Sequence, residues 1–257
     1  MAEKMDYKNY EVVKTEDGSF TLFSSQYNQC YHSTKDGALV ESMYKHILPA
    51  FSHQKDQNTL TILDICFGLG FNTLATLWYN DQHDKKTLKI YTPELDSDML
   101  KHLDVMIYPT ELKPYIPILQ ELLETGSYRD NNYEIELYIG DARSYIKKFT
   151  DHFDIVYQDA FSPDENPFLW TREYFKDIKS AMKKSGVLTT YSIALKTRLA
   201  LYDNGFDIYT YDNEKTRTST LALLEENSYE SESVKLVNMK HKILINSEVQ
   251  ALSDKDI

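Results

Sequence analysis

The central part of the chain alternates short apolar runs with segments whose apolar residues recur at helical spacing. The apolar runs cover residues 60–67, 88–93, 133–139, 153–158 and 187–191. The helical segments cover residues 72–82, from 97 onward, 142–149, 173–184 and 196–204. Alternation of this kind is typical of a parallel sheet with helices on both faces. Two last predicted strands, 206–211 and 219–224, are joined by a short loop and should pair antiparallel.

Segments outside this alternation complete the predicted organisation. Asp17-Gly18 lies between two alternating runs, which predicts a β-hairpin, and Ser33 or Thr34 could cap a helix over residues 36–51. Two further elements are predicted outside the alternation: a helical insertion at 108–126 and a strand at 241–245. We therefore expect an N-terminal β-hairpin and helix extension at 1–55, a main domain at 56–225, and an acidic tail at 226–257.

Composition narrows the class of protein. The chain has 257 residues, and no apolar run approaches the roughly 20 residues that span a bilayer. Residues 1–10 lack the apolar stretch of a signal peptide, so we expect a cytoplasmic protein. Cys30 and Cys66 are the two cysteines, and neither a disulfide nor a zinc site is expected. Cys66 falls at the end of an apolar run, which predicts a small core residue.

The net charge of −12 opposes nonspecific binding to nucleic acid, since that binding depends on Lys and Arg releasing counterions from phosphates. An RNA substrate would have to meet a local basic patch. Residues 171–217 contain nine basic and six acidic residues, which is a weak excess. Solvated helix faces explain the same residues equally well.

Two glycines follow the first long apolar run directly, in the order Gly68-Leu69-Gly70. This predicts a strand, a tight turn and a helix N-terminus, where bare backbone and free N–H groups can approach a ligand. Thr73 replaces the third glycine of the dinucleotide fingerprint. The pattern therefore favours S-adenosylmethionine, which has a ribose but no pyrophosphate. A plain strand-to-helix turn is the alternative.

Acidic residues follow three later predicted strands, at the edge where open parallel sheets bind ligands. Glu94 follows Gly70 at close to the roughly 20-residue offset of a ribose-binding acid. Asp141 is placed to accept from the adenine amine, and Ala142 or Arg143 could offer a backbone N–H to the ring. Either acid could instead be a helix N-cap. Asp159 is the predicted catalytic residue, because it would face both the methyl group and a basic substrate.

The loop after Asp159 is the predicted substrate loop. It is irregular, and loops at this edge commonly hold substrate. Trp170 could stack on a base or anchor the loop, and the anchoring role is favoured. Thr171 could cap the next helix.

The chain resembles the methyltransferase half of the MnmC family, which modifies the wobble uridine of bacterial tRNA. The resemblance covers about residues 31–224. It lies in Phe67-Gly68-Leu69-Gly70-Phe71-Asn72, Glu94, Gly140-Asp141, Asp159-Ala160-Phe161-Ser162-Pro163, Asn166-Pro167 and Trp170-Thr171, with Tyr31-His32-Ser33, Asp36-Gly37 and Glu41 upstream. It implies a class I S-adenosylmethionine-dependent methyltransferase fold, Rossmann-like, with a mostly parallel seven-stranded sheet and an antiparallel last strand.

The resemblance also implies an activity and a site. The activity is N-methylation of 5-aminomethyluridine, 2-thiolated or not, in the anticodon region of tRNA. The implied cofactor-binding residues are Phe67, Gly68, Gly70, Asn72, Glu94, Asp141, Ala142 and Asp159. The implied substrate-binding residues are Tyr31, Phe161, Pro163, Trp170, Lys215 and Arg217. Nothing after residue 224 resembles the family's oxidase domain, so a separate enzyme is expected to supply the aminomethyl group.

The implied chemistry depends on charge. An alkylamine is mostly protonated at neutral pH, and only its neutral form has the lone pair that attacks a methyl group. Asp159 would bind and orient the ammonium and help its proton leave. Because a sulfonium is a good leaving group, no metal is expected.

Two other functions remain open. An aminopropyltransferase of the spermidine-synthase type shares the fold, the ribose acid and an aspartate near an attacking amine. A noncatalytic cofactor-binding or RNA-binding module would keep the carboxylates only as structural caps.

Overall fold

The computed structural model describes residues 10–103, 106–224, 229 and 231–257. Residues 1–9, which were predicted not to form a signal peptide, lie outside the described residues. Residues 225–228 and 230, around the start of the predicted tail, also lie outside them.

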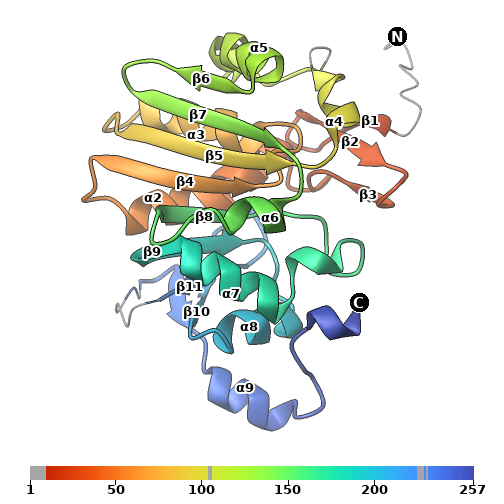
Figure 1. The fold of residues 1–257 in the computed structure, drawn as a ribbon, viewed down its shortest axis with the longest axis vertical. Helices are drawn as coiled ribbons and strands as arrows, with labels where there is room; N and C mark the ends of the chain where they lie inside the picture. The colour runs from red at the N-terminus through yellow and green to blue at the C-terminus, as the bar shows by residue number, and fades with distance from the viewer. Residues whose placement is uncertain (1–9, 104–105, 225–228, 230) are drawn as a thin grey trace.

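A single large sheet forms the centre of the described chain (Figure 1). Its strands are β4 (Thr59–Ile65), β5 (Thr87–Glu94), β6 (Ser127–Arg129), β7 (Tyr133–Ile139), β8 (Phe153–Gln158), β9 (Met182–Thr190), β10 (Asp207–Tyr211), β11 (Ser219–Leu223) and β12 (Val234–Leu236). Their order across the sheet is β12-β10-β11-β9-β8-β4-β5-β7-β6.

The strand directions confirm the predicted α/β methyltransferase topology. Strands β7, β5, β4, β8 and β9 are parallel neighbours, and β11 lies antiparallel between β9 and β10. The described sheet has nine strands rather than seven, because β6 and β12 pair antiparallel at its two edges. Each of these edge strands has three residues, which is too short to give a recognisable period-2 pattern.

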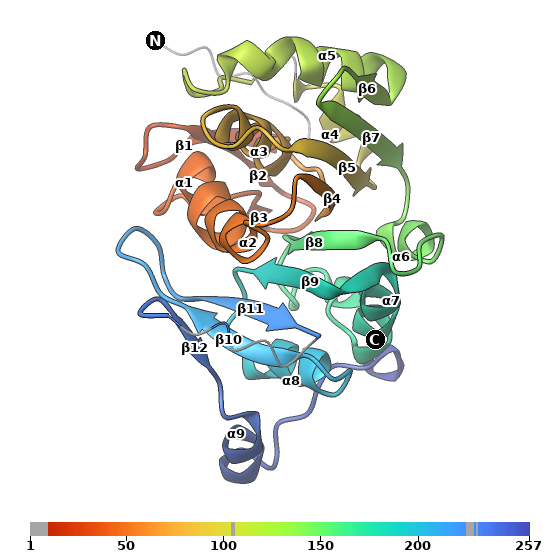
Figure 2. The same cartoon turned by 90° about the vertical axis from the view of Figure 1, so that its left-hand side faces the viewer.

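Helices cover both faces of the sheet, as Figure 2 shows. The described helices are α1 (Ala38–Glu41), the π-helix η1 (Ser42–Ile47), α2 (Leu48–His53), α3 (Phe71–Asp81), α4 (Ser97–Leu100), the 3-10 turn η3 (Lys113–Tyr115), α5 (Ile116–Thr125), α6 (Ala142–Ile146), the 3-10 turn η4 (Pro167–Leu169), α7 (Arg172–Ala181), α8 (Leu195–Tyr202), α9 (Met239–Ile245) and the 3-10 turn η5 (Asp254–Asp256). Among the described residues, no helix combines the length and hydrophobicity needed to cross a membrane.

Strand β4 is apolar along its length because both of its faces are covered. Leu60 and Ile62 pack into the core shared with α2, α3 and α5, while Leu63 and Ile65 pack into the core shared with α6, α7 and α8. All four side chains are fully buried. Burial on both faces fixes where the strand ends and therefore where its glycine turn begins.

The N-terminal extension contains the predicted hairpin. Strands β1 (Tyr10–Lys14) and β2 (Phe20–Ser24) pair antiparallel, and β3 (Gln29–Cys30) adds to β2. The predicted N-caps were wrong, since the following helix begins after Gly37, which has a φ of 90°. Ser33 instead closes the preceding turn by accepting from the Asp36 amide at 3.0 Å.

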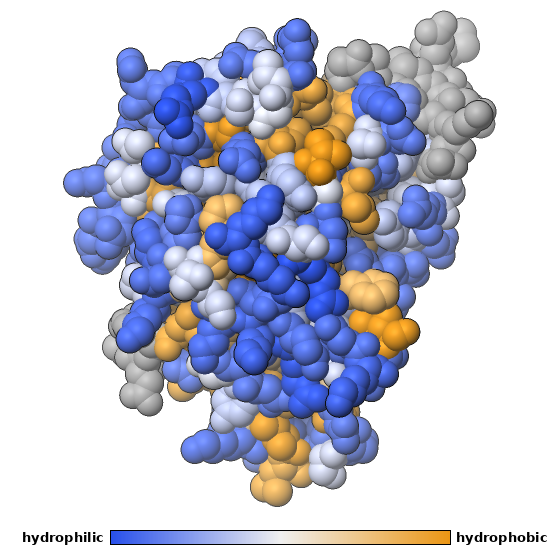
Figure 3. Space-filling view, viewed as in Figure 1, coloured by the Kyte–Doolittle hydropathy of each residue, from blue (hydrophilic) through white to orange (hydrophobic). Residues whose placement is uncertain are grey.

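The predicted strand at 241–245 was also wrong, because these residues form α9. Asn238 caps this helix by accepting from the His241 amide at 2.9 Å. A short apolar run cannot by itself distinguish a strand from a helix turn. Leu244 is 77% exposed, and the apolar colour at the lower end of Figure 3 marks this helix.

The C-terminal segment returns to the main domain and packs against α7. The Arg172 amide donates to the Leu252 carbonyl at 2.9 Å, and the Thr171 hydroxyl donates to Asp254 at 2.7 Å. Thr171 also caps α7, as predicted, by accepting from the Tyr174 amide.

Candidate active site

The turn after β4 has left-handed backbone at three positions. Cys66, Gly68 and Gly70 have φ values of 66°, 54° and 75°. The Gly70 amide donates to the Phe67 carbonyl at 2.8 Å, and Gly70 is the N-cap residue of α3. A Cβ atom on Gly70 would lie 2.9 Å from Cζ of Phe67, so the close turn requires glycine. The predicted strand, turn and helix are all present.

Cys66 lies just outside the observed strand but packs against the core, as predicted. It follows the last residue of β4, is only partly buried and lines the cavity described next. Its surroundings nevertheless make it a poor nucleophile, because burial and the nearby Glu94 raise the pKa of the Cys66 thiol well above its ordinary value.

A cavity of about 1230 Å³ lies at the carboxyl edge of the parallel strands, large enough for a cofactor and part of an acceptor. The predicted residues that line it are Tyr31, Phe67, Gly68, Asn72, Glu94, Asp141, Ala142, Asp159, Phe161, Pro163 and Arg217. Gly70, Trp170 and Lys215 are not among its lining residues. The strand-end acids therefore meet in one place, as the topology requires.

Glu94 is buried and holds the glycine turn in place. One carboxylate oxygen accepts from the Gly68 amide at 2.8 Å, and the other accepts from the Asp96 amide at 2.8 Å. Burial raises the pKa of the Glu94 carboxyl, and the two amide hydrogen bonds oppose that rise. Each oxygen keeps a second lone pair that a ligand hydroxyl could use.

Glu94→Gln is expected to weaken cofactor binding at least about tenfold, because one buried backbone amide would face an NH₂ group instead of an acceptor. Isothermal titration calorimetry with S-adenosylmethionine measures the effect. Glu136→Gln is the matched control, since that carboxylate is exposed on β7 and accepts from Tyr145 outside the cavity. Equal affinity in both variants would contradict a role for Glu94.

Asp141 is a helix N-cap and also lines the cavity. Its side chain accepts from the Arg143 amide at 2.9 Å at the start of α6. The guanidinium of Arg143 pairs with Asp254 at 2.6 Å. Asp141 is thus the N-cap that the sequence allowed, and its second carboxylate oxygen accepts from the Ser144 hydroxyl at 3.3 Å.

Asp159 follows β8 and belongs to a connected polar network. Asn72 donates to Asp159 at 2.9 Å and lies 3.3 Å from an oxygen of Asp64, while Thr73 donates to Asp64 at 2.8 Å. Asp64 is fully buried on β4, and burial raises the pKa of its carboxyl to about 7. Asp64 was not predicted as a site residue, because the sequence of an apolar strand does not show which face an acid within it occupies.

The raised pKa of Asp64 predicts a pH-dependent stability. The folded-state pKa of about 7 lies above the ordinary value of 3.8, so the contribution of Asp64 to stability is present below about pH 4 and lost as the pH rises through 7. Between about pH 4 and pH 8, the melting temperature of Asp64→Asn is expected to fall less than that of the wild type.

Asp56→Asn, at an exposed position, controls for the substitution itself. Melting curves at the two pH values give the comparison. Parallel losses in wild type and Asp64→Asn would show that Asp64 does not titrate in this range.

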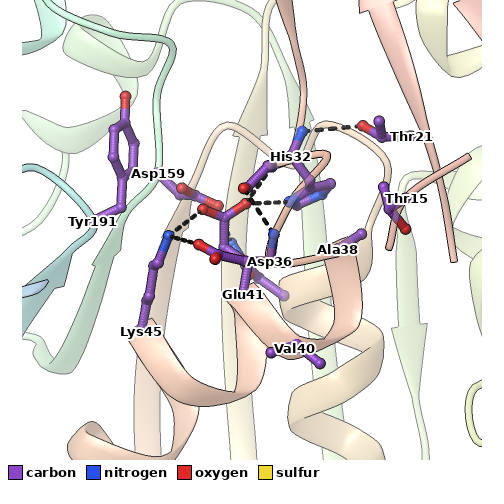
Figure 4. Close-up of polar contacts among 12 residues, drawn as sticks. Thr15, Thr21, His32, Asp36, Ala38, Val40, Glu41, Lys45, Asp159 and Tyr191 are labelled. Carbon is purple, nitrogen blue, oxygen red and sulfur yellow. Dashed lines mark hydrogen bonds and ion pairs between the residues drawn. The ribbon is translucent and has the colours of Figure 1, made fainter. Parts of the chain in front are cut away.

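The N-terminal helix brings a buried ion cluster to the cavity, as Figure 4 shows. Lys45 lies 2.8 Å from Asp36 and 2.7 Å from Glu41. Burial favours the neutral acid, but the nearby His32 ring, 3.7 Å away, and the charge and hydrogen bond of Lys45 lower the pKa of the Glu41 carboxyl to about 2. The Glu41 carboxylate and the Lys45 ammonium therefore form a buried ion pair that fixes α1 and η1 beside the cavity.

Lys45 and the neighbouring His46 were missed by the sequence analysis. Both lie in η1, where the wider π-helical turn places them on a face that α-helical spacing does not predict. Both residues are buried, and the sequence signal for them was weak, because Glu41, Ser42 and Tyr44 make the same segment polar as well.

Trp170 is buried and anchors the substrate loop, as favoured above, rather than facing the cavity. Its indole N–H donates to the Phe161 carbonyl at 2.7 Å, and its ring packs edge-on against Phe175 and Tyr191. The Phe161 ring, which Trp170 thereby positions, makes an edge contact with Tyr31 at 4.9 Å. Any contribution of Trp170 to substrate binding is therefore indirect.

A family model described as S-adenosyl-L-methionine-dependent methyltransferase matches residues 110–224. The chain is 35% identical over 208 residues to an uncharacterized protein of Methanocaldococcus jannaschii, covering 78% of this chain and 55% of that protein. It is 26% identical over 206 residues to the tRNA 5-methylaminomethyl-2-thiouridine biosynthesis bifunctional protein MnmC of Leptospira interrogans, covering 74% of this chain and 31% of that protein. The chain thus spans about half of the first relative and about a third of the second.

Two solved structures resemble this one along almost the whole chain. The crystal structure of MnmC2 from Aquifex aeolicus matches with a TM-score of 0.78 and 31% identity, covering 94% of this chain and 77% of that one. Spermidine synthase from Thermotoga maritima matches with a TM-score of 0.57 and 16% identity, covering 93% and 83%, which is a likeness of fold alone.

Proposed function

The chain belongs to the family of S-adenosyl-L-methionine-dependent methyltransferases that includes MnmC2, and we propose that it methylates the primary amine of 5-aminomethyluridine at the tRNA wobble position, with or without 2-thiolation. The observation that carries the proposal is the 31% identity to MnmC2 over 94% of this chain. The names of the MnmC relatives, which refer to biosynthesis of 5-methylaminomethyl-2-thiouridine in tRNA, support the choice of acceptor.

The cavity fits S-adenosylmethionine. The backbone of Phe67, Gly68 and Gly70 would approach the cofactor, and the free lone pairs of the Glu94 carboxylate suit its ribose hydroxyls. Asp141 and the Ala142 amide at the start of α6 would receive the adenine edge. Bound there, the cofactor supplies a methyl group on a positively charged sulfur.

Asn72 and Asp159 would face the reacting end of this cofactor. The amide Oδ1 of Asn72 is buried without a hydrogen-bond partner among the described residues, while its Nδ2 holds Asp159. Such an orphaned acceptor is what a ligand donor would satisfy. Asp159 therefore has a fixed orientation from which it can bind a substrate ammonium.

The acceptor nucleoside would enter between Asp159 and the aromatic residues of the cavity wall. Phe161 and Tyr31 are in edge contact and, together with Pro163, offer an apolar wall to a base. Arg217 lines the cavity, and Lys215 lies in the same loop outside it; both would meet the RNA backbone.

The net charge of −12 means that RNA affinity must come from such local contacts, and salt should weaken binding only modestly. We also propose that a separate enzyme supplies the aminomethyl group of the substrate.

Two measurements test the proposal. The purified protein is incubated with S-adenosylmethionine and tRNA that carries 5-aminomethyluridine, and the nucleosides are analysed by mass spectrometry. The expected product is 5-methylaminomethyluridine, with no product from tRNA that carries unmodified uridine. In cells that lack the gene, the aminomethyl form should accumulate. Absence of both outcomes would disprove the proposed function.

A polyamine is the alternative acceptor, and the acidic residues of the cavity favour it. Asp36, Glu41, Asp96 and Asp159 all line the cavity, although Lys45 neutralises part of this charge. Incubation with decarboxylated S-adenosylmethionine and putrescine separates the two functions. Turnover of that pair alone, without methylation of tRNA, would replace the tRNA proposal with aminopropyl transfer.

A further inference from the structure

His46 is a fully buried histidine directly behind Asp159. Its Nδ1 lies 2.8 Å from the hydroxyl of Thr189 on β9, which fixes the ring. Its Nε2 lies 3.4 Å from Oδ1 of Asp159 and has no hydrogen-bond partner among the described residues. The ring also packs beside Tyr157 at 5.6 Å.

This arrangement is unusual for a histidine with a purely structural role. Buried polar atoms are nearly always hydrogen-bonded, and an exception next to a carboxylate that lines the cavity requires an explanation. Asp159 separates His46 from the cavity, and Asp159 is itself held from its other oxygen by Asn72. His46 can therefore exchange a proton with the cavity only through Asp159.

We propose that His46 acts through Asp159 as the acceptor of the proton that the substrate ammonium must lose before methyl transfer. This inference rests on the proposed function, since it requires an amine acceptor. An imidazole changes charge near neutral pH, whereas a carboxylate alone is too weak a base to hold a proton taken from an alkylammonium.

The step balances without a further reactant. The ammonium N–H bond breaks and the proton bonds to a carboxylate oxygen of Asp159, and it then bonds to Nε2 of His46 as that O–H bond breaks. The freed nitrogen lone pair takes up the methyl group, while the electron pair of the broken carbon–sulfur bond stays on sulfur. After the product leaves, the imidazolium returns its proton through Asp159 to water.

Titratable and charged groups face His46 from several elements. Asp159, just after β8, lies 3.4 Å from Nε2, and Asp64 on β4 also lies nearby. Tyr157 from β8 stays neutral, because burial raises the pKa of its phenol. On the helix of His46 itself, the Lys45 ammonium is paired with Asp36 and Glu41, which offset its repulsion.

The test compares His46→Gln with the wild type in methylation of 5-aminomethyluridine tRNA across pH 7 to 9. Gln keeps a donor near the position of Nε2 but cannot take up a proton. The wild-type kcat is expected to be nearly constant over this range. In His46→Gln, kcat should fall about 10²-fold at pH 7 and then rise about tenfold per pH unit, because only substrate whose amine is already neutral in the enzyme complex reacts. The KM for the cofactor should change less than about twofold.

His152→Gln is the matched control, because His152 also has a buried, unpartnered Nε2 and packs against Phe149 and Phe153 away from the cavity. It should keep the flat profile. His46→Asn has a shorter side chain, which can reach Thr189 but not Asp159, so it should reproduce the steep profile. If His46→Gln fails to bind cofactor, His46→Asn takes its place in the test.

The outcomes separate this inference from the proposed function. A flat profile at wild-type rate in both His46 variants, beside a wild type that methylates tRNA, would overturn the proton route alone. A wild type that methylates no 5-aminomethyluridine tRNA would disprove the proposed function and the route with it.

Discussion

Asp159→Asn is expected to lower kcat for methyl transfer by about 10²- to 10⁴-fold while leaving the affinity for S-adenosylmethionine within about twofold. Asparagine preserves the shape of the side chain and can still contact Asn72, but it has no charge to hold an ammonium. The amine then loses both its orientation and its route for proton release. Steady-state kinetics with 5-aminomethyluridine tRNA, together with calorimetry for the cofactor, gives the two values.

Asp164→Asn is the matched control, because it makes the same change at an exposed position of the same loop, outside the cavity lining. It should retain nearly full activity. If Asp159→Asn turns over at the wild-type rate, Asp159 has no part in the chemistry and the proposed roles of His46 and Asn72 lose their basis.

Trp170→Ala is expected to destabilise the protein by about 3–5 kcal/mol, because it removes a fully buried indole and leaves a cavity. It also leaves the Phe161 carbonyl without its donor, so the loop that carries Asp159 and Phe161 should lose order. Denaturant unfolding measures the stability, and limited proteolysis of the loop measures the local effect.

Two other variants make this prediction specific. Trp170→Phe keeps most of the packing but loses the N–H, so about 1–3 kcal/mol is expected. Trp78→Ala changes the other tryptophan, which is only partly buried on α3, and should cost less than Trp170→Ala. If Trp78→Ala and Trp170→Ala lower the free energy of unfolding equally, Trp170 does not stabilise the protein more than a partly buried tryptophan does.

The strands that could be predicted from the sequence are those whose pattern of buried and exposed residues stays the same from end to end. The bounds of β7 and β8 agree with the predicted runs. The β7 segment alternates apolar and polar residues up to Gly140, and the β8 segment is mostly apolar up to Gln158 and Asp159. The strand at 241–245 failed for the opposite reason. Its apolar residues Ile243 to Ile245 remain exposed on α9, so hydrophobicity there does not report burial in a sheet.

The candidate site could be predicted only where topology alone brings residues together. Glu94, Asp141 and Asp159 follow parallel strands, so their meeting at one edge follows from strand order. Lys45 reaches the same cavity, and His46 reaches Asp159 from behind, on a π-helix whose wider turn has no sequence signature. Their positions depend on how the N-terminal extension packs against α3 and β9, which is a tertiary property.

The pairing of Asp254 with Arg143 and Thr171 has a practical consequence for anyone who shortens this chain. The matched family region stops at residue 224, and a fragment trimmed to that point would look like a natural unit. It would nevertheless lack Asp254, which joins the first turns of α6 and α7 through Arg143 and Thr171, and with it part of the cavity wall. Such a fragment would be a misleading stand-in for the enzyme in inhibitor screening.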